Sequence, residues 1–180
     1  GSLKDVSTLR TTFSKFDSIT DGRPVLAVMD KGFFSRKNVT AMLEDKKIKK
    51  FIISIPFTSS FAKHQVAGER KDIDCVQNTI VVNGDSMRAV SKVRVWDKEH
   101  KVFTHIYYSA KKAFQRREDL YAHIATLREE AEKSPAQYAD DNEHTKYLSI
   151  RRSEKVASGY TVSIREDVIS NELETAGWVV

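Results

Sequence analysis

The sequence lacks the features that define several large classes of protein. Cys75 is the only cysteine, which excludes an internal disulfide and a cysteine-rich zinc site and fits a reducing cytoplasm. No apolar run approaches the roughly 20 residues that span a bilayer, and nothing at the amino end reads as a signal peptide. We therefore expect a soluble protein with no membrane partner.

Common catalytic and nucleotide-binding motifs are also missing. The sequence has no P-loop, no Gly-x-Gly-x-x-Gly and no Gly-x-Ser-x-Gly. Its five histidines form no close metal-ligand pair, and the five-residue spacing of His100 and His105 puts them on opposite faces of a strand. Neither internal repeats nor low-complexity tracts are present.

Positive charge, by contrast, is concentrated in one stretch. The whole chain has a net charge of +5. Residues 88–117 contain nine Lys and Arg against two acids, Asp97 and Glu99, which makes this stretch more positive than the whole chain. A site for a polyanion is therefore expected here.

Hydrophobic spacing predicts an alternation of helices and strands in the first third of the chain. A helix is expected at 5–17, a loop at 21–24, a buried strand at 25–29, a helix at 36–46 capped by Ser35, and a second buried strand at 51–55. The order α-β-α-β is typical of an open, mostly parallel sheet. Val39, Met42 and Leu43 should face the core from the second helix.

The rest of the chain is predicted to be richer in strands. Irregular structure is expected at 58–76 and 134–146, strands at 79–82, 87–96, 102–109, 147–152 and 160–165, and helices at 110–133 and 166–176. Gly177 should end the last helix before a strand that begins at Trp178. The core-facing residues predicted for the long helix are Phe114, Tyr121, Ile124, Leu127 and Ala131, and those for the last helix are Val168, Ile169 and Leu173.

Asp30 is the main candidate for a catalytic residue and metal ligand. It ends the first predicted strand, at the sheet edge where open α/β folds place ligands, and carboxylates are the oxygens that Mg²⁺ prefers. Gly32 allows a sharp turn just beyond it. On the local pattern alone, an Asp that merely caps the following turn is the favoured interpretation.

A longer string around Asp30 resembles a known family. The apolar strand 25–29, then Asp30-Lys31-Gly32-Phe33-Phe34-Ser35, a helix and a second apolar strand resemble the region of the second catalytic aspartate in bacterial insertion-sequence DDE transposases. Residues 172–180, a short helix followed by glycine, an aromatic residue and an apolar strand, resemble the point where the catalytic domain of that family resumes after an insertion.

This resemblance implies a fold, an activity and a cofactor. The expected fold is α/β, α+β overall. Residues 3–57 would form part of a ribonuclease-H-like sheet, 58–176 an inserted β-rich region with a long helix, and 177–180 the start of a returning core strand. The implied activity is DNA transposition with Mg²⁺ or Mn²⁺, which needs three carboxylates. Only Asp30 is recognisable, so this piece is expected to be inactive alone, and the positions of the other two carboxylates stay open.

The basic stretch supplies the candidate DNA contacts. On the strand 87–96, Lys92, Arg94 and Trp96 share one face, which suits phosphate contact and base stacking. Phe103, His105 and Tyr107 alternate likewise on the next strand. An alternative is a half-exposed sheet face whose Trp96 packs on the long helix. On the long helix, Lys111, Lys112 and Arg116 are further candidates, although a salt-bridged solvent face would also explain them.

Three functions therefore stay open. The chain is a piece of a transposase that binds transposon ends and target DNA, in a bacterial cytoplasm near the nucleoid, with a homo-oligomeric parent. Alternatively it is a non-catalytic nucleic-acid-binding or interaction module from a transposase remnant, or an unrelated α/β enzyme. The last would need an acidic or nucleophilic partner for Asp30, for which Asp17 and Asp21 are the nearby candidates.

Overall fold

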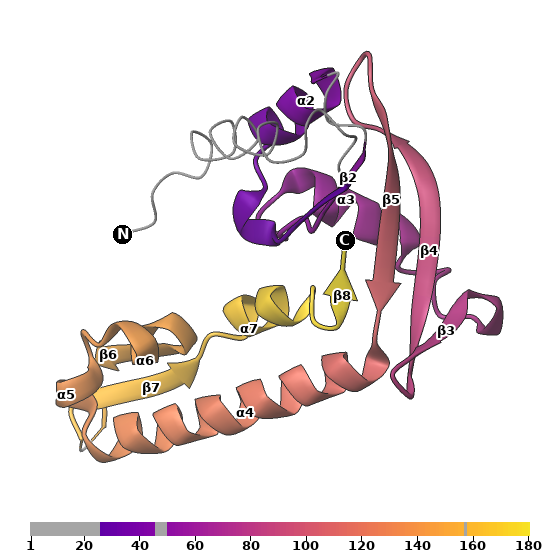
Figure 1. Cartoon of the computed structure of the whole chain (residues 1–180). Coiled ribbons are helices and arrows are strands. Elements are labelled where there is room, and N and C mark those ends of the chain that lie inside the picture. The colour runs from indigo at the N-terminus through magenta and orange to yellow at the C-terminus, as the bar shows by residue number, and fades with distance from the viewer. Residues whose placement is uncertain (1–25, 46–49, 157) are drawn as a thin grey trace. The chain divides into compact units, whose positions relative to one another are not determined.

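The computed structural model describes residues 26–45, 50–156 and 158–180 (Figure 1). The chain forms two compact units. The first extends to Tyr107 and includes Val179–Val180, and the second is Tyr108–Trp178. The division after Tyr107 does not coincide with the predicted boundary at 57/58. The helix predicted at 5–17, the loop at 21–24 and the neighbouring Asp17 and Asp21 lie outside the described residues.

A parallel pair of strands begins the described part of the first unit. β1 (Leu26–Met29) pairs with β2 (Lys50–Ile53), from Leu26 opposite Lys50 to Met29 opposite Ile53. Between them lie a 3₁₀ turn, η1 (Lys31–Phe33), and the helix α2 (Arg36–Glu44). The predicted cap is confirmed, because Ser35 Oγ accepts a hydrogen bond from the Asn38 N–H at 3.0 Å. The predicted strand–helix–strand order is confirmed.

Within the described residues, only one face of this strand pair is covered. We predicted buried strands, but Leu26, Val28 and Ile52 keep 56%, 71% and 56% of their surface exposed. The alternation of side chains explains the difference, since Met29, Phe51 and Ile53 turn to a core that includes Val39 and Met42. The remaining members of this core are Phe33, Phe34, Leu43, Phe61, Trp96 and Val102. Expecting both faces of these strands to be buried was therefore wrong for this chain.

Residues 58–76 are not irregular as predicted, because they contain the helix α3 (Ser60–Glu69), followed by η2 (Val76–Asn78). The buried side of α3 combines apolar Ala62 and Val66 with polar Gln65 and Glu69. A helix whose inner side is half polar has almost no hydrophobic periodicity, and α3 also lacks a side-chain cap at Ser59. The usual helix signals are therefore absent from its sequence.

A four-stranded sheet follows, in the order β3-β4-β5-β8. Its strands are β3 (Thr79–Val82), β4 (Asp85–Val95), β5 (Lys101–Tyr108) and β8 (Trp178–Val179). Asn83 and Gly84 connect β3 to β4 with φ of 51° and 83°, as a two-residue Asn-Gly hairpin requires. At the next turn, Trp96 N–H donates to His100 O at 2.9 Å, so the predicted hairpin at 97–100 is confirmed.

The second unit is built on one long helix (Figure 1). α4 (Ala110–Lys133) is followed by α5 (Pro135–Tyr138), α6 (Asn142–Tyr147), the antiparallel hairpin of β6 (Leu148–Arg152) and β7 (Tyr160–Ile164), and α7 (Glu166–Leu173). The predictions for α4, the hairpin and α7 are confirmed. The loop predicted at 134–146 is wrong in part, because two short helices lie there. The sequence signals for them are Pro135 at the first position of α5 and Asp141, which caps α6.

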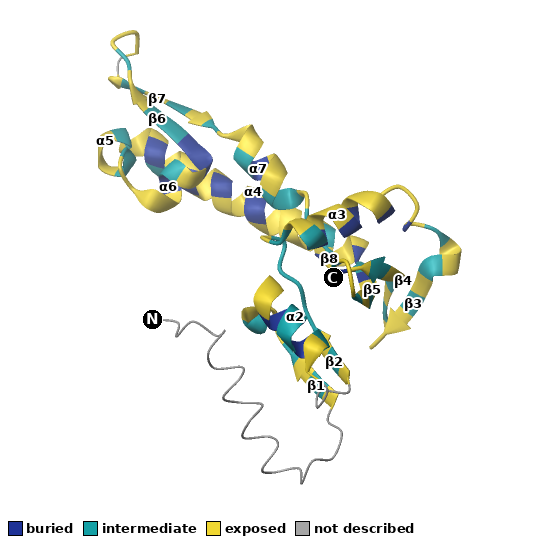
Figure 2. Cartoon of the chain, turned by 90° about the horizontal axis from the view of Figure 1, so that it is seen from above, coloured by how far each residue is buried: buried dark blue, intermediate teal, exposed yellow. Residues whose placement is uncertain are grey.

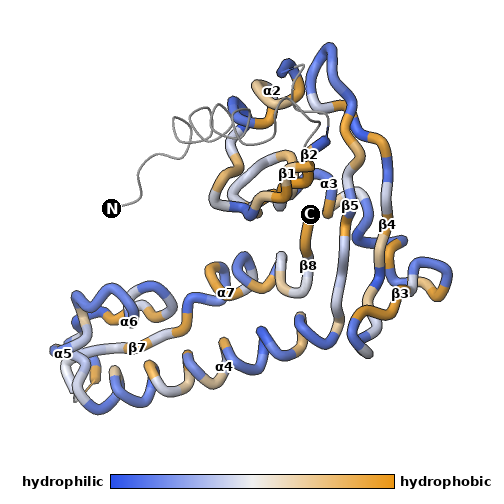
Figure 3. The backbone as a smooth tube through the Cα atoms, viewed as in Figure 1, coloured by the Kyte–Doolittle hydropathy of each residue, from blue (hydrophilic) through white to orange (hydrophobic). Residues whose placement is uncertain are grey.

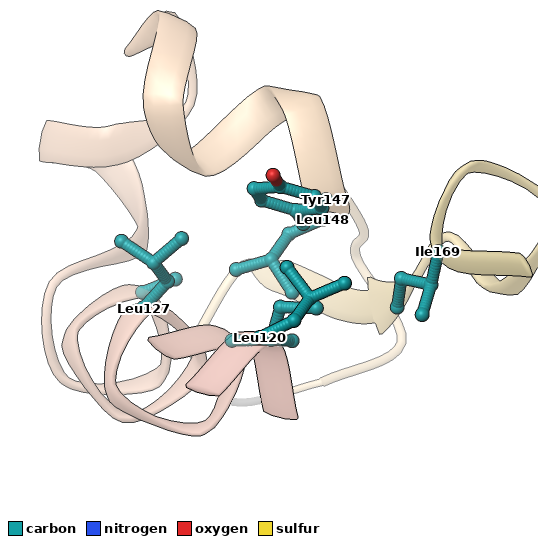
Figure 4. Packing of buried hydrophobic residues seen from close by; sticks show 7 residues of the cluster. Leu120, Leu127, Tyr147, Leu148 and Ile169 are labelled. Carbon is teal, nitrogen blue, oxygen red and sulfur yellow. The ribbon is translucent and has the colours of Figure 1, made fainter. Parts of the chain in front are cut away.

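The core of this unit lies between α4, the hairpin and α7 (Figure 4). Its fully buried members are Leu120, Ile124, Leu127, Ala131, Tyr147, Leu148 and Ile169. The inward positions predicted for α7 are confirmed, since Val168 and Leu173 pack on this cluster beside Ile169. For α4 the prediction missed Leu120 and was wrong about Phe114 and Tyr121, which are 61% and 51% exposed. The buried positions of α4, dark blue in Figure 2, recur at intervals of four, three and four residues, and Phe114 and Tyr121 fall outside this stripe.

The described residues thus form a mixed α and β protein with separate sheets, which confirms the α+β class in its coarse form. The last helix, α7, ends at Leu173 with its cap at Glu174, so the prediction that Gly177 ends it is wrong; Gly177, with φ of 79°, lies in the turn before β8. Its carbonyl accepts a hydrogen bond from the Ser109 N–H at 2.9 Å, and the ring of Trp178 lies 4.7 Å from that of Tyr108. The two ends of the second unit are therefore held together.

Candidate functional site

Asp30 lies at the carboxyl end of β1, as predicted, and is exposed. Its Oδ1 accepts a hydrogen bond from the Gly32 N–H at 2.7 Å, so the carboxylate caps the 3₁₀ turn that follows. This is the capping geometry that the local pattern also allowed. One carboxylate oxygen is thereby engaged, and the position at the sheet edge keeps the side chain accessible to solvent.

The residues around Asp30 do not fit a two-metal centre. Among the described residues, no group of three or more His, Cys, Asp or Glu side chains is arranged to hold a metal ion. A two-metal site requires several carboxylates that clamp the attacking and leaving oxygens from both sides. Asp30 alone, with one oxygen already accepting from Gly32, could at most contribute one ligand to a site completed by other groups.

The two predicted DNA-contacting cations of β4 point at a buried acid. Lys92 Nζ donates to both carboxylate oxygens of Glu69 at 2.7 Å, and Arg94 donates to the same carboxylate at 2.5 Å. The side chain of Glu69, on α3, is only 4% exposed. Lys92 and Arg94 do share a face of β4, as the alternation predicted, but that face is turned toward α3, where the single carboxylate of Glu69 compensates part of their charge.

Trp96 occupies the core rather than an exposed position. It is 4% exposed and packs with Val39 and Met42 of α2, with its Nε1 donating to Thr40 Oγ1 at 3.1 Å. The guanidinium of Arg36 lies 5.4 Å from the ring centre and donates to the Trp96 carbonyl at 3.2 Å. A ring enclosed in this way is not available to stack on a base. The alternative interpretation, a half-exposed face whose Trp96 packs on the long helix, is also wrong, because the ring is buried and packs on α2.

The remaining predicted cations lie on the first two turns of α4, which Figure 3 colours mostly as hydrophilic. Lys111, Lys112 and Arg116 are all exposed, as is Arg117 beside them. Arg116 forms an ion pair with Glu172 of α7. Within the part of the chain that the structure describes, the side chains of Lys112 and Arg117 have neither an ion pair nor a hydrogen bond. These two cations are therefore the ones best placed to meet an anion from outside.

Sequence reasoning did not find the acid that Arg116 meets. Glu172 also accepts from Tyr147 OH at 2.9 Å and lies 3.0 Å from Lys146 Nζ. Burial alone would raise the pKa of Glu172, but the hydrogen bonds and charges of Lys146, Tyr147 and Arg116 outweigh it and lower the pKa. The hydrogen bond to Tyr147, followed by that to Glu172, raises the pKa of Lys146. These contacts join α4, α6 and α7, so their first effect is structural.

A second polar cluster holds α6 against α4. His144 is 5% exposed, with Nδ1 2.8 Å from Asp141 Oδ1 and Nε2 3.1 Å from Glu130 Oε2. Its ring stacks on Tyr138 at 4.0 Å. Hydrogen bonds from the backbone and the ring of His144 lower the pKa of Asp141. The Asp141-x-x-His144 spacing is a visible cap signal, but its partner Glu130 is distant in the chain.

Comparison with models of known protein families, with curated proteins and with solved structures finds no match to this chain. In the described residues, none of the helices combines the length and apolar character needed to cross a membrane. The case for a function therefore depends on the geometry described above and on the motif around Asp30.

Proposed function

We propose that this chain is a piece of a DDE transposase of the insertion-sequence type, acting in DNA transposition by metal-dependent phosphodiester cleavage and strand transfer. The supporting observation is the run β1–Asp30–Gly32–Ser35–α2–β2. Asp30 ends one strand of a parallel pair, and a capped helix connects it to the second strand. The ribonuclease-H-like core and the β-rich insertion are part of this proposal.

A contact at the far end of the chain supports the same proposal. The Ile55 N–H, just beyond β2, donates to the carbonyl of Val180 at 2.8 Å. Val180 is 9% exposed, and Val179 and Val180 group with the first unit. A chain that leaves after β2 and returns beside it is what an insertion within a core sheet requires. The exposed Leu26, Val28 and Ile52 are the kind of face that further core layers cover.

Catalysis in this proposal belongs to a centre that Asp30 would share with two further carboxylates. Bound Mg²⁺ or Mn²⁺ would activate the attacking oxygen and stabilise the leaving one. Asp30 would act as one ligand held in place by its hydrogen bond from Gly32. Because the described residues arrange no group of three metal ligands, we expect this chain to show no cleavage or joining of DNA alone.

The proposal is tested in two steps. The reading frame on either side of residues 3–180 should encode an upstream strand that ends in Asp and a downstream helix with a Tyr-Arg-Glu motif. In the parent protein, Asp30→Asn should reduce strand transfer by at least about 100-fold while preserving the fold, because a two-metal site does not tolerate loss of a charged ligand. Flanking sequence without either carboxylate, or full activity of Asp30→Asn, would contradict the proposal.

The exposed cations of α4 favour a second candidate, a non-catalytic nucleic-acid-binding module. Lys112 and Arg117 are exposed near the start of the helix, beside Lys111 and Arg116. Such a cluster would contact phosphates without reading sequence, so affinity should fall steeply with salt. DNA binding by this surface is compatible with both candidates. If the parent protein retained its activity without Asp30, only the second candidate, the non-catalytic nucleic-acid-binding module, would remain.

A pair of double variants tests this surface. Duplex affinity is measured at several salt concentrations for the parent chain, for Lys112→Ala/Arg117→Ala, and for Lys92→Ala/Arg94→Ala. The first pair should lower the salt slope by about two units, since each phosphate contact contributes about one. The second pair, directed at Glu69, should leave the slope unchanged. Identical slopes in all three proteins would mean that the α4 cations are only solvated.

A further inference from the structure

The β6–β7 hairpin has two faces of opposite chemical character. One face packs on the core of the second unit beside α4 (Figure 1), and its central side chains are apolar. The residues that make this packing are Leu148, Ile150, Val162 and Ile164. Because side chains alternate along a strand, the residues between these positions project from the other side of the hairpin. We call that side the outer hairpin face, and it consists of Ser149, Arg151, Thr161 and Ser163.

The outer hairpin face carries a cation and hydroxyl groups but no acid. Arg151 lies opposite Thr161, and on the neighbouring pair Ser149 lies opposite Ser163. Within the described ranges of the chain, the side chains of Ser149, Arg151 and Ser163 have neither a hydrogen bond nor an ion pair. The hydroxyl of Thr161 donates to the Arg151 carbonyl at 3.4 Å. The guanidinium and the two serine hydroxyls are therefore available as donors to a group from outside the chain.

The turn of the hairpin adds a second available cation. Lys155 is exposed, and its side chain also has no partner among the residues that the structure describes. Residues 148–164 contain three Lys or Arg and one acid, Glu154, so the hairpin has a net charge of +2. The third cation, Arg152, donates from its Nε to Tyr160 OH at 3.3 Å, away from the outer hairpin face. Arg151 and Lys155 are therefore the cations of the hairpin that are best placed to meet an anion.

The chemistry of this face fits the backbone of DNA better than the surface of a protein. Phosphate oxygens accept hydrogen bonds, and Arg, Ser and Thr side chains are among the usual donors to them in protein–DNA complexes. The centre of a protein–protein interface is apolar and depleted in charge, whereas none of the four residues of the outer hairpin face is apolar. Interfaces with DNA are more polar and more positive.

We propose that the outer hairpin face binds the phosphate backbone of duplex DNA, with Arg151, Ser149 and Ser163 as the donors. Lys155 adds a second cation at the turn. The inference rests on the proposed DNA-binding function and gives the second unit another contact surface, distinct from the α4 cations. Because the contacts go to phosphates, binding by the hairpin should fall with salt and should not depend on the base sequence.

The first test measures duplex affinity at several salt concentrations for the full chain and two double variants. Arg151→Ala/Lys155→Ala should lower the salt slope by about two units, since each phosphate contact contributes about one. Arg128→Ala/Lys133→Ala is the matched control, because it removes the same charge from the same unit, at exposed α4 cations that form ion pairs with neighbouring acids. The control should leave the slope unchanged. Thermal unfolding of each variant verifies that the fold is intact.

A second test introduces an acid on the outer hairpin face. Ser163→Glu puts a negative charge opposite Ser149, where it would repel a phosphate, so duplex affinity at low salt should fall by at least about tenfold. Thr126→Glu makes the same kind of change at an exposed hydroxyl of α4 and should lower the affinity much less. The two variants have the same net charge, so a difference between them reports the position of the acid.

These outcomes decide the inference. It stands if Arg151→Ala/Lys155→Ala lowers the slope, Ser163→Glu weakens binding, and the two controls on α4 do neither. It is overturned if the hairpin variants bind like the full chain, or if they lose affinity for polyglutamate as strongly as for DNA, which would indicate an acidic protein segment as the partner.

Failure of this inference is distinguishable from failure of the proposed function. Unchanged binding by the hairpin variants, together with a reduced slope for Lys112→Ala/Arg117→Ala, would overturn the role of the hairpin and leave DNA binding by α4 intact. Absence of duplex binding by the full chain at low salt would overturn both the hairpin contact and the nucleic-acid-binding module.

Discussion

The carboxylate of Glu69 lies directly against the ammonium of Lys92, with both of its oxygens 2.7 Å from Nζ. The two residues are far apart in the sequence and come from a helix and a strand. Arg94 adds a second cation to the same buried carboxylate. Burial of a carboxylate costs free energy unless its charge is compensated, so Lys92 and Arg94 stabilise the folded protein by pairing with Glu69.

Removal of Glu69 should therefore destabilise the first unit. Glu69→Ala leaves Lys92 and Arg94 without their acceptor and should lower the free energy of unfolding by about 2 kcal/mol, the range of a hydrogen bond to a charged group. Urea denaturation followed by Trp fluorescence measures this change. Glu118→Ala, an exposed acid on α4, should change the stability little. Equal effects of the two substitutions would show that the Glu69 contact contributes nothing specific.

Gly177 should be intolerant of any side chain. Its φ is 79°, and a Cβ placed there would lie 2.5 Å from the Ser109 carbonyl oxygen and 2.7 Å from the Ala113 Cβ. Gly159 also has a positive φ, 69°, but a Cβ there meets nothing within 4 Å. We expect Gly159→Ala to cost about 1 kcal/mol and Gly177→Ala at least about twice as much, measured by thermal unfolding. Similar losses of stability in the two variants would mean that the backbone around Ser109 can move away from the added Cβ at little cost.

The lowered pKa of Glu172 predicts a loss of stability in acid. Because the pKa in the folded state lies below its ordinary value of 4.5, the stabilisation is complete above that pH and is lost as the pH falls through the folded-state pKa. Unfolding between pH 6 and pH 3 should show a steeper decline for the parent than for Glu172→Gln, which cannot ionise. Parallel curves for the two proteins would contradict the assignment. The pKa of Asp141 is also lowered, from an ordinary value of 3.8, so its protonation should reduce the stability further at still lower pH.

Two substitutions separate the local role of Asp30 from a metal-binding one. Asn retains an oxygen that can accept from the Gly32 N–H, whereas Ala does not. In this chain Asp30→Ala should therefore lower stability by roughly 0.5–1 kcal/mol and Asp30→Asn by less, as measured in urea. Loss of activity in the parent with Asp30→Asn, at unchanged stability, would then report the charge alone.

Elements with strong local signals were predicted well. Ser35 begins α2 because its hydroxyl can satisfy the free Asn38 N–H at the helix start. Gly177 lies in the turn that precedes β8, where its positive φ favours a residue without a side chain, although α7 itself already ends at Leu173. α4 and the β6–β7 hairpin follow from long periodic patterns. The position of Asp30 at the end of a strand was likewise visible in the sequence.

Errors arose where local patterns were weak or ambiguous. α3 was missed because Gln65 and Glu69 occupy its buried side. Phe114 was assigned to the core of the long helix because it is large and apolar, yet the stripe that packs runs through Leu120 instead. Side-chain hydrophobicity cannot say which of two adjoining helical stripes meets a neighbour. That choice depends on where the hairpin and α7 lie along α4.

Charge pairing was the part that only tertiary structure decided. The sequence showed a basic stretch, and strand alternation correctly placed Lys92 and Arg94 on one face, but their partner Glu69 belongs to a helix that the pattern did not reveal. Arg116 meets Glu172 across 56 residues of chain. Local preferences extend over only a few residues, because the hydrogen bonds and side-chain contacts within one helix or strand join residues that are close in the sequence. Contacts between elements depend on how those elements pack, and here that packing decided which cations are compensated within the protein.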